Sequence, residues 1–175
     1  MEKFVLIKPS AEYLDELASY KAETLSAEDH MHGDSGLDEA DDIAAWIESC
    51  KKTETDPPSG FVAAEQFMFL REGETRIIGL ANFRHSLGEE GSYLSRHGGH
   101  FGGSVRPSER NKGYAKAMLL MCLDKARERG LEKVLLVCAP DNETSRKTII
   151  ACSGQYESTV RTGDEVDDRY WIHLK

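Results

Sequence analysis

The sequence Arg106-Pro107-Ser108-Glu109-Arg110-Asn111-Lys112-Gly113-Tyr114-Ala115 links a short apolar strand to a strongly amphipathic helix through a turn that contains glycine. The first four N–H groups of a helix have no partners within it, and the helix dipole places partial positive charge at the same end. Main-chain atoms can therefore bind an anionic phosphate group there. Gly113 and Ala115 keep the approach open, and Arg110 and Lys112 add positive charge. The stretch has neither the Gly-Lys-Ser/Thr of a P-loop nor the third glycine of a dinucleotide fingerprint.

The pattern Arg110-x-x-Gly113-x-Ala115 resembles the acetyl-CoA pyrophosphate motif, Arg/Gln-x-x-Gly-x-Gly/Ala, of the GNAT superfamily of N-acetyltransferases. A strand precedes the motif, a helix begins in it, and a second apolar strand leads to Asn142 and Ser145, as in that family. Longer strings resemble a bacterial branch of predicted small GNAT acetyltransferases and extend the resemblance to nearly the whole chain: Gly99-His100-Phe101, 104–115, Lys147-Thr148-Ile149-Ile150 and Arg169-Tyr170-Trp171-Ile172.

The resemblance implies one GNAT domain over residues 1–175 with an α/β (α+β) fold. Its central sheet would be mixed, mostly antiparallel and of about six or seven strands, with helices on both faces. Apolar periodicity predicts strands at 3–8, 66–70, 77–84, 99–105, 134–138, 155–160 and 169–174. It predicts helices after an N-cap at Ser10, around 43–47, over 112–129 and from 142 to about 151.

The strands 99–105 and 134–138, with the helix between them, are expected to form a right-handed parallel β-α-β unit. The resemblance further implies that these two strands splay apart and open a slot for the pantetheine arm. Acceptor specificity is expected in the irregular segments 26–36, 53–65 and 86–98.

Composition limits the classes of partner. Of the 175 residues, 39% are hydrophobic and 30% are charged, as in a soluble globular protein, and no apolar run approaches the roughly 18 residues that cross a bilayer. No secretory signal is visible at the start, so we expect a cytoplasmic protein with no membrane partner. The formal net charge of −9 argues against nucleic acid and mildly favours a cationic amine.

Neither disulfides nor a metal site are expected. The four cysteines are widely spaced in apolar patterns and are predicted to be reduced core thiols: Cys50, Cys122, Cys138 and Cys152. His30-x-His32, with nearby acidic residues, is interpreted as part of a solvated loop because it has no defined third ligand.

The resemblance implies acetyl-CoA as the cosubstrate. Main-chain N–H groups near the end of the strand before the motif would meet the acetyl carbonyl, here at Ser104, Val105 and Arg106. The residues expected around the pyrophosphate are Arg110, Asn111, Lys112, Gly113, Tyr114, Ala115 and Lys116. Asp141 or Asn142 is expected to cap a helix, and the resemblance adds a contact of the Asn142 amide with the CoA arm, with Ser145 near the pyrophosphate side.

Amine attack on a thioester requires a neutral amine, so the site must remove a proton from the ammonium. His100 is the first choice of base, because it begins the strand beside the thioester and an imidazole has an unperturbed pKa of about 6.5. His85 and Glu65 come next. The alternative for each is a hydrogen-bonded wall residue, with water carrying the proton.

The sequence does not single out one group that would protonate the departing thiolate. Many family members place a tyrosine seven residues after the asparagine, but this chain has Ile149 there. Tyr114, Tyr156, water or no group then remains for this step. Cys122 and Cys138 are poor nucleophile candidates, because direct attack needs no covalent enzyme intermediate.

The leading hypothesis is an acetyl-CoA-dependent N-acetyltransferase that acts on a primary amine of a small molecule or peptide by direct attack in a ternary complex. A catalytically silent acyl-CoA-binding or sensor module is the first alternative. A nucleotide-binding protein that uses the same turn for another phosphate is the second. The identity of the amine and the existence of a homodimer are left open.

Overall fold

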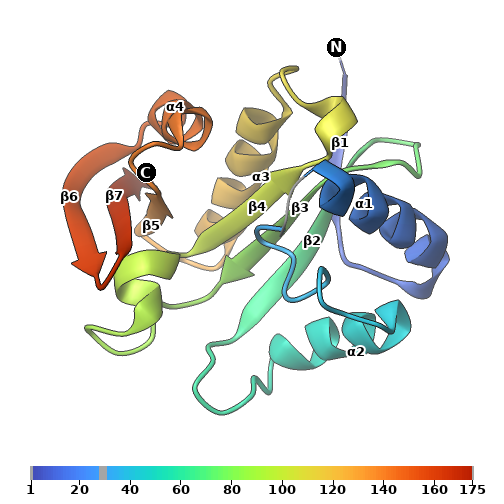
Figure 1. Ribbon diagram of the computed structural model, residues 1–175, viewed down its shortest axis with the longest axis horizontal. Coiled ribbons are helices and arrows are strands. Elements are labelled where there is room, and N and C mark those ends of the chain that lie inside the picture. Colours follow the sequence, from blue (N-terminus) through green and yellow to red (C-terminus); the bar gives the residue numbers. More distant parts are fainter. Residues whose placement is uncertain (1, 28–30, 175) are drawn as a thin grey trace.

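The computed structural model describes residues 2–27 and 31–174, and its strands form two antiparallel sheets (Figure 1). The first sheet has the order β1 (Phe4–Ile7), β2 (Ala64–Arg71), β3 (Ile77–Arg84), β4 (Phe101–Val105). The second sheet has the order β5 (Lys133–Cys138), β7 (Glu165–His173), β6 (Gln155–Thr162). The second sheet and the chain's C-terminal end lie together on the left of Figure 1, away from β1.

Helices cover both faces of the first sheet. The helices are α1 (Leu14–Ala27) and α2 (Ile43–Thr53) on one face and α3 (Tyr114–Glu128) on the other, while α4 (Glu143–Ala151) lies beside α3 and β5. Short helical turns are η1 (Ala11–Tyr13), η2 (Leu94–Gly98) and η3 (Pro107–Glu109). Along β2, Phe67 and Phe69 pack into the core shared with α3, while Met68 and Leu70 pack into the core shared with α1 and α2. Alternate strand residues point to opposite faces, so the apolar part of this strand, Phe67 to Leu70, is buried on both sides.

The predicted α/β fold with helices on both faces is confirmed, but the expected mixed sheet divides into two antiparallel sheets, and strands 99–105 and 134–138 do not form the expected parallel pair. In the described residues no ladder joins β4 to β5. The His100 N–H donates to the Leu135 carbonyl oxygen at 2.8 Å, and the Leu135 N–H donates to His100 Nδ1 at 2.9 Å. Because an imidazole nitrogen takes the place of a backbone carbonyl, the pairing stops there.

Several element boundaries differ from the prediction. The strand before the motif begins at Phe101 rather than at Gly99, whose φ is +65°, and α3 begins at Tyr114 rather than at Lys112. Ser10 precedes η1 but makes no side-chain cap hydrogen bond. The segment 86–98, predicted to be irregular, contains η2.

The four cysteines are buried and free, as predicted. Within the two described ranges, no helix combines the length and the apolar character that a membrane crossing requires.

The segment between α1 and α2 docks onto the first sheet through buried polar side chains. Gln66 Nε2 donates to the Gly33 carbonyl oxygen at 2.9 Å, and Asn82 Nδ2 donates to Ser35 Oγ at 2.9 Å. Gly33 has φ +65°, and a Cβ there would lie 2.2 Å from the carbonyl carbon of Gly102 in β4. The segment therefore reaches β4 only because residue 33 has no side chain.

Because Gly33 lies so close to β4, adding a single methyl group at this position should reduce the stability of the protein by an unusually large amount. Gly33→Ala should lower the free energy of unfolding by roughly 2 to 4 kcal/mol, through positive φ and overlap with Gly102. Gly36→Ala is the matched control, because Gly36 also has positive φ but a Cβ there meets nothing within 4 Å; about 1 kcal/mol is expected. Urea denaturation of both variants measures the difference, and equal losses would contradict the proposed contact.

Candidate functional site

The N-terminus of α3 carries no side-chain cap. Its N-cap is Gly113, with φ +81°, and a Cβ there would meet nothing within 4 Å. The Ala117 N–H makes the first bond of this helix, to the Gly113 carbonyl oxygen. The N–H groups of Tyr114, Ala115 and Lys116 precede that bond and are directed out of the helix end. The predicted cradle therefore has the main-chain geometry that an anion requires.

Glu109 fixes the turn that leads into this helix. Its side chain is 8% exposed and accepts from Lys112 Nζ at 2.9 Å, Arg76 Nε at 3.1 Å and Arg71 Nη2 at 3.2 Å. Burial alone would raise the pKa of Glu109, but these three hydrogen bonds outweigh it and hold the pKa at about 2. The Lys112 ammonium is thus partly neutralised by Glu109 and held next to Gly113.

Arg106 is directed into the protein rather than toward the cradle. Its side chain is fully buried; Nε donates to Glu23 at 2.8 Å, Nη2 donates to Ser19 Oγ at 2.8 Å, and Nη1 donates to Glu16. Its main-chain N–H donates to the Ile78 carbonyl oxygen at 2.7 Å. The residue therefore ties α1 to the end of β4, a role that residue type alone did not indicate.

The free edge of β4 supplies a second set of main-chain donors. Leu80 of β3 lies opposite Ser104 of β4, and the Arg84 N–H donates to the His100 carbonyl oxygen. The even-numbered residues of β4 therefore direct their backbone N–H and C=O groups toward β3. Successive strand residues direct these groups to opposite edges. Gly103 and Val105 therefore direct theirs away from β3, toward the gap beside β5. Of the three predicted N–H donors, Val105 has this orientation, and Gly103 was missed.

Tyr20 is a second residue that the sequence did not single out. Its hydroxyl group lies 3.1 Å from the Ser104 carbonyl oxygen and 2.9 Å from Ser104 Oγ, and its side chain is fully buried. Burial raises the pKa of Tyr20 to about 12, so the hydroxyl stays neutral. Its position matched the apolar periodicity of α1, which hid the polar contact to β4.

His100 is held as a structural link. Burial lowers the pKa of His100 to about 4, and Nδ1 already accepts the Leu135 N–H. The neutral ring therefore carries its proton on Nε2. A base needs a free acceptor nitrogen, and the one acceptor nitrogen of this ring is occupied.

Tyr114 and His85 have separate partners. Tyr114 packs its ring against Phe4, and its hydroxyl group accepts from Arg71 Nη2 at 2.7 Å. His85 Nε2 lies 3.0 Å from Glu65 Oε2, and Glu65 also pairs with Arg129, next to the C-terminal end of α3. His85 thus lies on the α3 face of the sheet, whereas the segment with Gly33 crosses the other face.

Of the two predicted candidates, Asp141 and Asn142, it is Asn142 that caps α4. Its Oδ1 accepts from the Ser145 N–H at 3.1 Å. The cap uses the amide oxygen, and the amide nitrogen can still donate to a ligand. Ile149, which replaces the tyrosine of many family members, is buried in the core shared with α3.

Other predicted residues have simpler positions. Tyr156 is 58% exposed and packs edge-on against Tyr170. His30 lies outside the described residues, and His32 is exposed.

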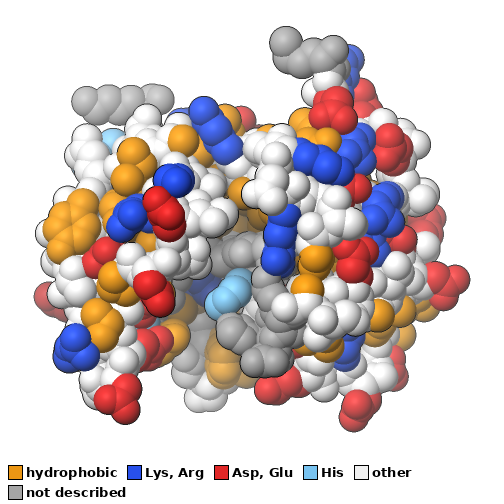
Figure 2. Space-filling view, turned by 45° about the horizontal axis from the view of Figure 1, so that its top comes forward, with side chains coloured by type: hydrophobic (Ala, Val, Ile, Leu, Met, Phe, Trp, Pro, Cys, Tyr) orange, Lys and Arg blue, Asp and Glu red, His pale blue; other side chains and the backbone are white. Residues whose placement is uncertain are grey.

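Figure 2 shows that one face of the molecule is hollowed. The hollow lies between the part that carries β6, β7 and α4 and the part that carries α1, and a histidine side chain is visible inside it. Because β4 and β5 separate in this part of the molecule, we place the candidate site here.

A family model described as an acetyltransferase (GNAT) domain matches residues 3–153, so this chain belongs to the GNAT family of acetyltransferases. It is thus an N-acetyltransferase that depends on acetyl-CoA. No curated protein matches the chain.

Solved structures share the fold. The microcin C7 self-immunity acetyltransferase MccE, in complex with acetyl-CoA and AMP, aligns with a TM-score of 0.73 at 15% identity over 98% of this chain and 93% of that one. The Salmonella typhimurium acetyltransferase that modifies the N-terminal serine of ribosomal protein L7/L12 gives 0.71 at 11% identity, over 99% and 96%. The Vibrio cholerae spermidine/spermine N-acetyltransferase SpeG gives 0.66 at 16% identity, over 98% and 94%.

The geometry of Glu109 predicts how stability depends on pH. Its folded-state pKa lies below the ordinary value of 4.5, so its contribution is present above about pH 4.5 and is lost as the pH falls toward 2. Glu109→Gln should lower the free energy of unfolding at pH 7 by on the order of 2 kcal/mol and flatten this dependence. Urea denaturation across pH 2–7 measures both effects. The control is Glu143→Gln, which removes an exposed ion pair within a helix and should leave the pH dependence of stability nearly unchanged. If Glu109→Gln behaved in the same way, the stabilising role assigned to Glu109 would be contradicted.

The surroundings of His100 predict which substitutions it tolerates. In His100→Asn the side-chain oxygen of the introduced asparagine could still accept the Leu135 N–H, so this variant should keep kcat within about tenfold. His100→Leu leaves that N–H unpaired and should cost about 1 to 3 kcal/mol of stability. Steady-state kinetics with thermal denaturation separates the roles, because loss of a general base would reduce kcat of the His100→Asn variant by about 100-fold or more.

Proposed function

We propose that this protein transfers the acetyl group of acetyl-CoA to a primary amine by direct attack within a ternary complex. One observation carries the proposal: the uncapped N-terminus of α3 and the open edge of β4 offer two sets of main-chain donors on one continuous segment. The first matches a pyrophosphate and the second a thioester carbonyl. Family membership supports acetyl-CoA as the donor.

The proposed cosubstrate contacts follow from these positions. The N–H groups of residues 113–116 would meet the pyrophosphate, with Arg110, Asn111 and Lys112 around the same turn. Arg110 Nε donates to the Val105 carbonyl oxygen at 3.0 Å, so it also connects the cradle to the end of β4. The Asn142 amide nitrogen would donate to the CoA arm, and Ser145 would lie near its pyrophosphate side.

The chemistry needs no covalent enzyme intermediate. The neutral amine nitrogen attacks the thioester carbon, and the Val105 N–H on the open edge of β4 stabilises the oxyanion. The carbon–sulfur bond then breaks, and CoA leaves as the thiolate. His100, Tyr114 and His85 are each held by other groups, so we assign them positioning roles and propose that water takes the ammonium proton and protonates the thiolate.

The acceptor is proposed to be a cationic small molecule or a peptide N-terminus. The printed names of similar structures cover both kinds, a ribosomal protein N-terminal serine and spermidine or spermine. The net charge of −9 supports a positively charged acceptor. The segment that docks through Gly33 against β4 would form one wall of the acceptor site.

Calorimetric titration with acetyl-CoA tests the cradle, with ATP and NAD as comparison ligands. Gly113→Trp should weaken acetyl-CoA binding by about 100-fold or more, because the indole ring would cover the N–H groups at the helix end. Gly130→Trp is the matched control: Gly130 has φ +83°, similarly open space, and a place at the other end of α3. The control should bind acetyl-CoA like wild type.

Release of the CoA thiol in the presence of polyamines, aminoglycosides, amino acids and peptides then tests transfer. Acetyl-CoA-dependent turnover with at least one amine is expected. Tight acetyl-CoA binding without turnover of any amine class would contradict the transfer and leave a binding module. Equal loss of binding in both tryptophan variants would contradict the assignment of the cradle.

A further inference from the structure

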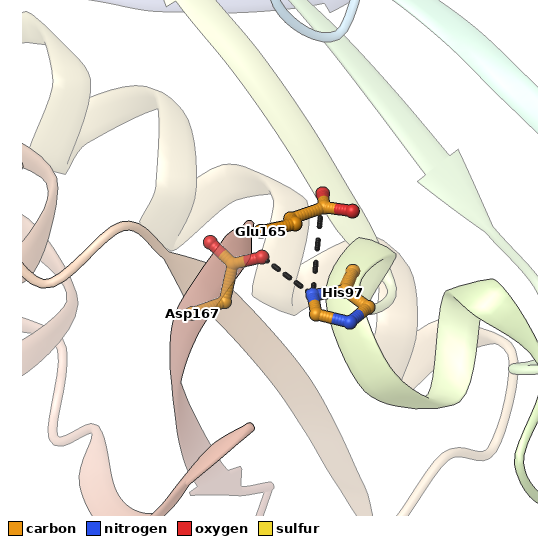
Figure 3. A group of neighbouring side chains, drawn as sticks. All are labelled: His97, Glu165 and Asp167. Carbon is orange, nitrogen blue, oxygen red and sulfur yellow. Dashed lines mark hydrogen bonds and ion pairs between the residues drawn. The ribbon is translucent and has the colours of Figure 1, made fainter. Parts of the chain in front are cut away.

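Three potential metal ligands from distant parts of the chain meet at the base of the second sheet (Figure 3). His97 comes from η2, and Glu165 and Asp167 come from β7. One ligand atom from each lies within 4.8 Å of the other two. His97 Nδ1 is 2.7 Å from Asp167 Oδ2 and 4.0 Å from Glu165 Oε1. In a tetrahedral zinc site with bonds of about 2.1 Å, ligand atoms are roughly 3.4 Å apart, so side-chain movements on the order of 1 Å would bring the three groups into place.

The charges at this cluster favour a cation. In the described part of the chain, the ion pairs of Glu165 and Asp167 within 4 Å are with His97 alone. Two carboxylates therefore share one imidazole. The His97 side chain is 1% exposed and the Glu165 side chain is 45% exposed, so the cluster is buried on one side and open to solvent on the other.

A second layer of contacts orients two of the three groups. His97 Nε2 lies 2.9 Å from Thr162 Oγ1, and the Tyr93 ring stacks on the imidazole with its centroid 5.6 Å away. The Tyr93 hydroxyl group donates to Glu165 Oε1 at 2.9 Å. Metal-binding histidines usually donate their second N–H to an oxygen, which fixes the ring and leaves the other nitrogen for the metal. Thr162 can accept in this way.

We propose that His97, Glu165 and Asp167 bind one divalent transition-metal ion, with Zn²⁺ the best match to one imidazole nitrogen and two carboxylate oxygens. The ion replaces the hydrogen bond between His97 Nδ1 and Asp167, and water fills the remaining positions on the exposed side. The proposal runs against the sequence-based expectation of no metal, because residues 97 and 165 show no ligand spacing along the chain.

Such an ion would join η2 to the β6–β7 hairpin and so fix the segment that enters β4. The carbonyl oxygens of Gly98 and Gly99 accept from Arg84 Nη1 at 3.0 and 3.2 Å, and His100 follows directly. The ion would have a structural role, because its ligand His97 precedes β4 in the chain, whereas the proposed thioester site lies at the edge of β4. Its presence should therefore be visible as stability, independently of acetyl transfer.

Calorimetric titration of chelator-treated, full-length protein with Zn²⁺ tests the site, with Mn²⁺ and Mg²⁺ as separate probes. One Zn²⁺ per chain is expected, bound more tightly than Mg²⁺, together with a higher thermal midpoint. Glu165→Gln and Asp167→Asn should each weaken Zn²⁺ binding at least about tenfold and abolish the shift. Tyr93→Phe keeps the ring but removes the hydroxyl group, and should weaken binding less.

The control is Asp164→Asn, an exposed carboxylate in the turn of the same hairpin, which should bind Zn²⁺ like wild type. Circular dichroism verifies that each variant is folded, and the half-exposed Glu165 makes Glu165→Gln the least disruptive of them. Absence of Zn²⁺ binding by the wild type would overturn the proposal. Unchanged binding in both Glu165→Gln and Asp167→Asn would do the same, and the cluster would then be only a hydrogen-bonded ion pair.

Discussion

Two hydrogen bonds between His100 and Leu135 hold β4 to β5 and also end their pairing. Because the second bond is made by an imidazole nitrogen, no carbonyl continues the ladder, and β4 keeps a free edge. Gly99 permits this geometry, since a Cβ there would lie 2.6 Å from the Leu135 carbonyl oxygen. Both the division into two sheets and the main-chain donors of the proposed thioester site follow from this single junction.

Buried polar contacts keep that free edge in a fixed position. Arg106 ties the end of β4 to α1 through carboxylates, and Tyr20 reaches Ser104 from the same helix. The segment with Gly33 presses on the middle of β4. Removing the carboxylates that pair with Arg106 should be strongly destabilising, because its fully buried guanidinium would be left as an uncompensated charge. The site is therefore rigid on its α1 side before any ligand binds.

The predictions succeeded where neighbouring residues in sequence carry the information. Apolar periodicity located α3, the glycine turn located its uncapped N-terminus, and the cap of α4 was narrowed to Asp141 or Asn142, because each depends on contacts within a few residues. Side-chain partners were predicted less well. Tyr114 was assigned to the cosubstrate from its place in the motif, yet its hydroxyl group accepts from Arg71. Arg106 was expected to offer its main-chain N–H, which donates to the Ile78 carbonyl oxygen instead, while its side chain binds Glu23.

The sequence by itself determined the class of fold, the family and the helix end that we propose as the phosphate cradle, because these depend on short-range pattern and backbone geometry. Only the tertiary structure decided which strands separate, which N–H groups face the gap, and that His97 meets Asp167. The physical reason is that strand pairing and buried ion pairs join residues far apart in the chain. Their energies depend on burial and direction, which no local spacing specifies.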